Sequence, residues 1–191
     1  MGNFNLPPVV TCPGATDYCK SVCYATKGRF KWGNVKKSHL LSLEASKQDD
    51  FVEKAIKECR KLDFVRLHSS GDFLSPEYTY KWYQIALSCP STQFCAYTRS
   101  WRKPLEFKNI LKELNKLPNF HLFLSIDKDT GLPNQKFYKD FRLAYCNKTW
   151  QRPADSFRCP NQISKKKPTC DECKLCYRSR GKFRSVEFVE H

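Results

Sequence analysis

The chain has 191 residues, enough for one domain with a sizeable core and too few for two full domains. Its 34 lysines and arginines against 19 acidic residues give a formal net charge of +15, so polyanions such as nucleic acids are candidate partners. No apolar run approaches the roughly 20 residues of a membrane helix and the start carries no secretion signal, so we expect a soluble, cytoplasmic protein with no membrane partner.

Helical and strand patterns alternate along the middle of the chain. Val35 to Arg60 has apolar residues at helical spacing, and residues 63–68 have the composition of a short buried strand. A second helix is predicted from Ser75, a capping residue followed by proline, to about residue 88. The pattern then predicts a strand at 92–98, a helix at 104–117 and a strand at 120–126.

This alternation predicts an α/β fold with a parallel sheet, whose functional loops follow the carboxyl ends of the strands. Three such loops carry polar residues, at 69–72, 99–102 and 127–129. From Thr149 onward the periodicity fades. We therefore expect two parts: residues 1–148 with the βα units, and residues 149–191 as a small cysteine-rich module organised by metal.

A first group of cysteines, Cys12, Cys19 and Cys23, precedes the first predicted helix with the spacing C-x6-C-x3-C. An odd total of eleven cysteines favours metal binding in a reducing compartment over a disulfide framework. Three thiolates can hold three irons of a [4Fe-4S] cube and leave the fourth iron exchangeable. The alternatives are a zinc site completed by a histidine or by Cys95, and plain buried thiols.

A second group joins the Cys159-Pro160 pair to two consecutive C-x2-C steps at Cys170, Cys173 and Cys176. This spacing is typical of ferredoxin-type loops with four thiolate ligands, and we expect a second [4Fe-4S] cluster there. A zinc ribbon has the same kind of spacing, so zinc remains the alternative at this site.

The other cysteines are expected to be core or unligated residues: Cys59, Cys89, Cys95 and Cys146. At the end of the strand at 63–68, Gly71 would permit close approach of a ligand, and Asp72 could accept a hydrogen bond from an ammonium group. Both are also common in ordinary turns. Arg66 and His68 could face either a cavity or solvent.

The order of these motifs resembles the radical S-adenosylmethionine superfamily over roughly Cys12 to Asp129. In that superfamily a Gly-Gly-Glu-Pro motif follows the cluster cysteines, and here Ser70 to Phe73 stands in its place. The resemblance implies a truncated (β/α) partial barrel and S-adenosylmethionine bound at Gly71 and Asp72. An electron donor is the partner it implies, and the last cysteine group is similar to the auxiliary clusters of some members.

The chain is also similar to small phage-borne and plasmid-borne proteins that share its Cys-Pro-Gly-Ala-Thr start and cysteine-rich end, a resemblance that implies a family without a reaction. The leading interpretation is an iron–sulfur protein with two [4Fe-4S] clusters that acts on or binds nucleic acid. The alternative is a non-catalytic, zinc- or cluster-stabilised nucleic-acid-binding or redox-sensing regulator.

Overall fold

A computed structural model describes residues 1–147, 155–177 and 185–189. Within them the chain forms one sheet with the strand order β1-β2-β3-β4-β5-β7-β6, and every neighbouring pair is parallel. The strands are β1 (Gly2–Phe4), β2 (Phe64–Leu67), β3 (Gln93–Thr98), β4 (Phe120–Ile126), β5 (Arg142–Asn147), β6 (Ser156–Arg158) and β7 (Ser185–Val189). The predicted α/β class with parallel strands is confirmed.

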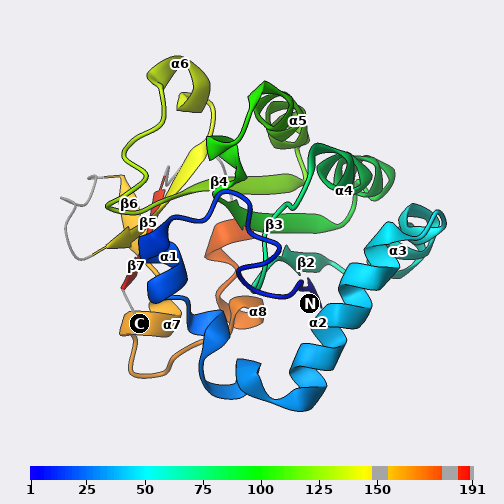
Figure 1. Cartoon of the computed structure of the whole chain (residues 1–191), viewed down its shortest axis with the longest axis horizontal. Coiled ribbons are helices and arrows are strands. Elements are labelled where there is room, and N and C mark those ends of the chain that lie inside the picture. Colours follow the sequence, from blue (N-terminus) through cyan, green and yellow to red (C-terminus); the bar gives the residue numbers. More distant parts are fainter. Residues whose placement is uncertain (148–154, 178–184, 190–191) are drawn as a thin grey trace.

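The first five strands lie in the sheet in the order in which they occur in the chain. Right-handed crossovers that always step in the same direction place the connecting helices on one face of a sheet. Figure 1 shows the strands as an arc with the middle helices on its outer side. These are α3 (Phe51–Cys59), α4 (Pro76–Ser88) and α5 (Leu105–Lys116). This is the arrangement of part of a βα barrel, as expected.

Alternation along the strands divides the core into two layers. On the outer face the strand residues Leu67, Phe94 and Leu122 pack against the helices, where Trp82 and Leu111 are almost completely buried. The inner face carries a separate cluster made of Cys95, Phe123, Ala144, Tyr177 and Val186. The inner cluster includes a residue of the C-terminal part, so that part covers the inner face of the sheet.

The single helix predicted from Val35 to Arg60 is two helices, α2 (Gly33–Lys47) and α3, and this prediction was wrong. Gln48 is extended, and the ammonium group of Lys81 on α4 donates hydrogen bonds to the carbonyl oxygens of Ser46 (2.8 Å) and Gln48 (3.5 Å). The chain therefore turns at α4, where α3 buries its apolar face. The helix predicted from Ser75 is confirmed as α4, because the Ser75 hydroxyl accepts a hydrogen bond from the Tyr78 N–H.

The C-terminal part contributes strands as well as cysteines. Strands β6 and β7 extend the sheet beyond β5, and between them come the short helices α7 (Pro160–Ile163) and α8 (Cys170–Cys173) and the 3-10 turn η4 (Leu175–Tyr177). The fading periodicity did not predict these strands. The expected boundary at 148/149 lies at residues outside the described ranges, so the division into two parts stays a prediction. No helix in the described ranges is long and apolar enough to span a membrane.

Candidate metal centres

The first cysteine group lies at the edge of the sheet where β2, β3 and β4 end. Cys12, Cys19 and Cys23 all line one cavity of about 190 Å³, and its wall also includes Gly71 and Asp72. The segment that carries them follows β1 (Gly2–Phe4) and contains the helix α1 (Asp17–Ser21). The structure thus brings together the two sets of residues that the sequence analysis singled out near the first predicted site.

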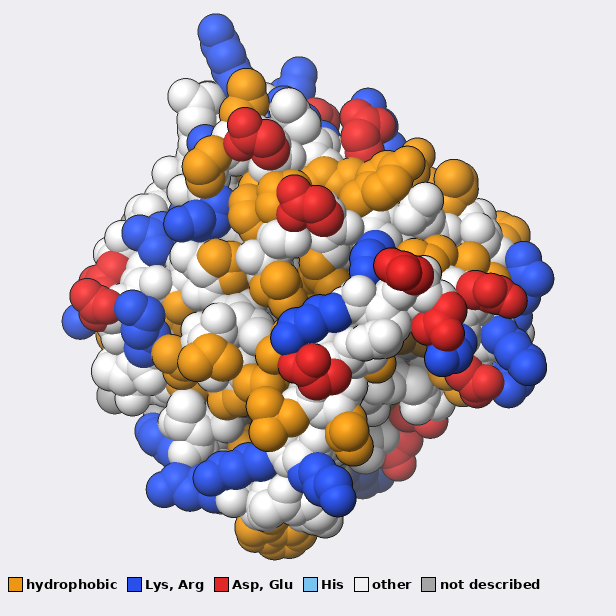
Figure 2. Space-filling model, turned by 45° about the vertical axis from the view of Figure 1, so that its right-hand side comes forward, with side chains coloured by type: hydrophobic (Ala, Val, Ile, Leu, Met, Phe, Trp, Pro, Cys, Tyr) orange, Lys and Arg blue, Asp and Glu red, His pale blue; other side chains and the backbone are white. Residues whose placement is uncertain are grey.

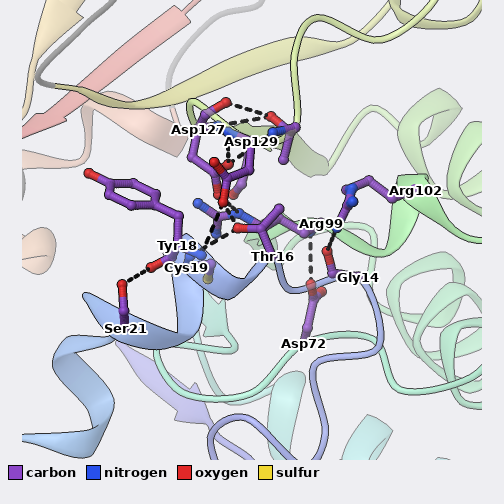
Figure 3. A network of polar contacts seen from close by, with 12 residues as sticks. Gly14, Thr16, Tyr18, Cys19, Ser21, Asp72, Arg99, Arg102, Asp127 and Asp129 are labelled. Carbon is purple, nitrogen blue, oxygen red and sulfur yellow. Dashed lines mark hydrogen bonds and ion pairs between the residues drawn. The ribbon is translucent and has the colours of Figure 1, made fainter.

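A network of polar contacts fastens this cysteine segment to the loops at the strand ends (Figure 3). Thr16 caps α1: its hydroxyl accepts a hydrogen bond from the Cys19 N–H and donates one to an Asp127 carboxylate oxygen, each at 2.9 Å. The same Asp127 oxygen forms an ion pair with the Arg99 Nε at 2.9 Å, and the Asp127 side chain is fully buried. Loops after β3 and β4 therefore position the helix that carries Cys19.

Two further contacts hold the ends of this segment. The Tyr18 N–H donates to the Asp129 carboxylate at 3.1 Å, and the Arg102 guanidinium donates to the Gly14 carbonyl oxygen at 2.8 Å. At Gly14 the backbone lies directly against the loop that follows β3, since a Cβ atom there would be 2.0 Å from the Arg99 carbonyl oxygen. Only glycine fits this approach.

The turn after β2 is held by the side chain of Asp72. One carboxylate oxygen accepts a hydrogen bond from the Phe73 N–H (2.7 Å), and the other accepts one from the Arg99 N–H (2.8 Å). Gly71 has a φ of +84°, and a Cβ atom there would be 2.6 Å from the Leu6 side chain. Burial raises the pKa of Asp72 to about 6. A ligand in the cavity would meet a carboxylate that is already fixed in place.

The surroundings of the first group disfavour the negatively charged thiolate forms of Cys12 and Cys19. Burial, together with the Asp72 carboxylate, raises the pKa of Cys12 to about 12. Burial also raises the pKa of Cys19, although the Arg99 guanidinium opposes this effect. Thiolates here need a positive group to balance them, and soft thiolate donors suit zinc or an iron–sulfur cluster.

The second cysteine group lies on the inner face of the sheet. Cys159, Cys170, Cys173 and Cys176 line a smaller cavity of about 30 Å³, so these four residues are brought together as well. Cys95 of β3 lies in the same wall and packs in the same cluster as Cys176. It does not line the first cavity. It is therefore placed to serve the second site, and not to complete the first site as one alternative had it.

Arg66, Tyr97 and Phe188 line both cavities and thus separate the two sites. The Arg66 guanidinium donates to the Cys170 sulfur at 2.9 Å and lies 5.3 Å from the centre of the Tyr97 ring. The Tyr97 hydroxyl donates to the Cys176 sulfur at 2.8 Å. Among the described residues, no carboxylate forms an ion pair with Arg66, and its Nε is buried without a hydrogen-bond partner.

His68 also lies in the wall of the first cavity, but its ring is engaged elsewhere. Its Nε2 is 2.9 Å from the Tyr78 hydroxyl, and the edge of the ring contacts Phe73. Burial lowers the pKa of His68 to about 3, so the ring is neutral at physiological pH.

The remaining cysteines fall into two kinds. Cys59 and Cys89 are buried in the outer core among the helices, as expected. Cys146 of β5 instead lines the first cavity, which the sequence analysis did not predict. The signal that could have found Cys95 and Cys146 is strand alternation, but it identifies a face only after the strands have been assigned to a sheet.

Within the described ranges, no three His, Cys, Asp or Glu side chains are arranged to hold a single metal ion. The cysteines of each group share a cavity without converging on one point.

Comparison with known proteins identifies viral relatives. The chain is 29% identical over 195 residues to the Gene 88 protein of Mycobacterium phage L5 and 28% identical over 200 residues to that of Mycobacterium phage D29. In both cases the match covers 89% of this chain and 79% of the relative. No solved structure matches. The family described as Gene product 88 matches residues 1–179, which confirms the resemblance to phage-borne proteins: the chain belongs to this family.

Proposed function

We propose that this protein binds two [4Fe-4S] clusters, one at Cys12, Cys19 and Cys23 and the other at Cys159, Cys170, Cys173 and Cys176. The observation that carries the proposal is the position of the first group. Three thiols from one segment share a single cavity with the loops that follow the parallel strands. This is the edge at which βα folds place their reactive groups.

The C-x6-C-x3-C spacing of the first group matches the way its segment is attached to the rest of the protein. The six residues between Cys12 and Cys19 include Gly14, which contacts the loop after β3, and Thr16, which caps α1, so this stretch attaches the segment to the strand ends. The three residues between Cys19 and Cys23 complete the last turn of α1. The segment from Cys12 to Cys23 can thus bring its three thiols to one cavity.

Three protein thiolates leave one iron of a cube without a cysteine ligand. With an external electron donor, a cluster of this kind supplies an electron and an exchangeable coordination position to a bound co-substrate. The resemblance to radical S-adenosylmethionine enzymes suggests S-adenosylmethionine as that co-substrate. Asp72, held by two backbone N–H groups in the cavity wall, is suited to accept a hydrogen bond from its ammonium group.

The second cluster is proposed to pass electrons to the first site or to anchor the substrate. Its support is the thin wall between the cavities, since Arg66 and Tyr97 line both and each donates a hydrogen bond to a cysteine sulfur of the second group. Hydrogen bonds to cluster sulfurs and nearby charges are the means by which proteins tune such clusters.

The test is anaerobic purification followed by iron, sulfide and zinc analysis, and electron paramagnetic resonance of the reduced protein with and without S-adenosylmethionine. We expect about eight irons per chain and a spectrum that the co-substrate changes. An unchanged spectrum would remove the co-substrate and leave the clusters. Zinc in place of iron would overturn the proposal and restore the alternative of a metal-stabilised regulator.

A further inference from the structure

A run of basic residues without acidic neighbours in the sequence lies beside the first cavity. Between Asp17 and Glu44 the sequence has no acidic residue and six basic ones. Five of the six lie within eleven residues, here called the basic segment: Lys27, Arg29, Lys31, Lys36 and Lys37. The segment spans the 3-10 turn η2 (Gly28–Lys31) and the first turns of α2.

These five cations are exposed and available to bind an anion. Each is solvent-exposed, and none forms an ion pair with a carboxylate in the part of the chain that the structure describes. Three lysines elsewhere in the described ranges are paired, by contrast. Lys54, Lys61 and Lys116 each pair with an acidic residue three or four positions earlier on the chain. The charge of the basic segment is therefore not neutralised locally.

An exposed aromatic ring lies in the middle of the basic segment. Trp32 is 62% exposed, the most exposed tryptophan in the described ranges, and it occupies the N-cap position of α2. Its neighbour Phe30 points the other way, with its ring 5.6 Å from that of Tyr24 and 6.1 Å from that of His39. The contacts of Phe30 hold the turn to the body of the protein, and Trp32 remains free to contact a ligand.

The basic segment continues directly from the cavity wall. Val22, Cys23, Tyr24 and Ala25 line the first cavity, and Lys27 follows two residues later. Tyr24 is 40% exposed, so it lies at the opening between the cavity and the surface. Figure 2 shows Lys and Arg side chains at the lower left of this face without acidic side chains among them, whereas both signs alternate in its upper part.

We propose that the basic segment binds a single-stranded nucleic acid and delivers a nucleotide to the first cavity. Backbone phosphates would pair with the five cations, and a base would stack on Trp32, the combination by which proteins bind single strands. An unpaired strand is required, because a base can stack or enter a cavity only when it has left its duplex. The delivery step rests on the proposed function, whereas the binding itself does not.

Fluorescence anisotropy of labelled oligonucleotides of about 15 nucleotides tests the proposal on the full chain. The probes are single-stranded DNA, single-stranded RNA and the corresponding duplex. We expect either or both single strands to bind more tightly than the duplex. Preferential binding of the duplex, or no binding at low salt, would overturn the proposal.

Two matched triple variants separate this surface from the general charge. Replacing Lys31, Lys36 and Lys37 with alanine should weaken binding about tenfold or more and lower the slope of log affinity against log salt by about 2. The control replaces three paired lysines elsewhere and removes the same net charge, Lys54→Ala, Lys61→Ala and Lys116→Ala. Equal weakening by both sets would show non-specific attraction and overturn the proposal.

Stacking is tested separately. Trp32→Ala should weaken binding about tenfold and remove the quenching of tryptophan fluorescence by the oligonucleotide. Tyr80→Ala, which removes a ring that is 50% exposed on α4, should leave the affinity unchanged. If Trp32→Ala binds as the unaltered protein does, the site is overturned.

Iron analysis of the same samples distinguishes the two proposals. A protein that holds its iron but does not bind the oligonucleotide contradicts only this inference. One that binds through the basic segment but holds no iron contradicts only the proposed clusters.

Discussion

The two cysteine sites differ in size, in enclosure and in what holds them. The first is a cavity of about 190 Å³ at the edge of the sheet. Its cysteine segment is held by hydrogen bonds to charged side chains of the neighbouring loops, those of Asp127 and Arg102. The second is a cavity of about 30 Å³ on the inner face, where Cys95 and Tyr97 of the sheet contact Cys176 directly. The first cavity is therefore several times larger than the second. This difference fits the proposal that the first site is the reactive one and the second supports it.

The largest expected effect comes from removing one ligand at each site. Cys12→Ala should lower bound iron by about four atoms and leave the spectrum of the second cluster, and Cys173→Ala should do the reverse. Cys89→Ser, a buried cysteine outside both cavities, serves as the control and should keep all the iron. If either ligand variant loses all its metal, the two sites are not independent and the comparison fails.

A nearly equal effect is expected from a change that touches no ligand. Gly14→Ala places a Cβ atom 2.0 Å from the Arg99 carbonyl oxygen, so the cysteine segment cannot dock on the loop that follows β3. The protein should lose the iron of the first site and keep that of the second, measured by iron analysis and spectra. Gly33→Ala, where nothing lies within 4 Å, is the control. Full iron content in Gly14→Ala would show that docking is not needed.

A medium effect is expected on the pH dependence of stability. Burial lowers the pKa of His68 to about 3, so below pH 6.5 the unfolded chain takes up a proton that the folded chain does not. The free energy of unfolding should therefore fall as pH falls from 6.5 toward 3, by up to about 1.4 kcal/mol per pH unit. Burial raises the pKa of Asp72 to about 6, which acts in the opposite direction between about pH 6 and 4.

The comparison of the unaltered protein with His68→Asn isolates the histidine. Asparagine tolerates the positive φ of +58° at this position and does not titrate. In denaturant titrations at matched metal content, the variant should lose the fall in stability below pH 6.5. An unchanged pH profile in the variant would mean that His68 is accessible to protons in the folded protein.

The smallest effect is expected at the wall between the sites. Arg66→Met removes a cation 2.9 Å from the Cys170 sulfur and should lower the reduction potential of the second cluster. The expected change is about 60 mV for each 1.4 kcal/mol of lost stabilisation, read from redox titrations followed by electron paramagnetic resonance. Arg60→Met, which removes a guanidinium bonded to the Ser88 carbonyl oxygen, is the control. Equal potentials in all three proteins would show that the wall does not tune the cluster.

Most helices and strands could be predicted because they depend on residues that are close together in the sequence. The cap at Ser75 and the alternating elements depend on neighbours in sequence, and the structure confirms them. The break after Lys47 had a local signal, because Asp50 stands at the N-cap of α3 with Glu53 in its first turn, but the continuous helical spacing of apolar residues masked it. Strand β6 has only three residues, too few for a periodic signal.

The candidate sites show the same limit. Cysteine spacing predicted both groups, because cysteines that lie on one segment are separated by only a few residues in the sequence. Cys95 joins the second group from β3, across the sheet, and Cys146 lines the first cavity from β5. Their membership is a property of the register between strands, which spacing along the chain does not contain.

The sequential order of the first five strands bears on how the chain is made. During synthesis each new strand can pair with the one before it as soon as it emerges, and the loops that grip the first cysteine segment are complete by residue 130. The cysteines from 159 to 176 emerge last and close over the inner face. There the Tyr177 hydroxyl contacts the sulfur of Met1, so a residue made late in synthesis lies against the first residue made. Because Phe188 also lines the first cavity, the wall of that cavity is complete only after this last part of the chain has been made.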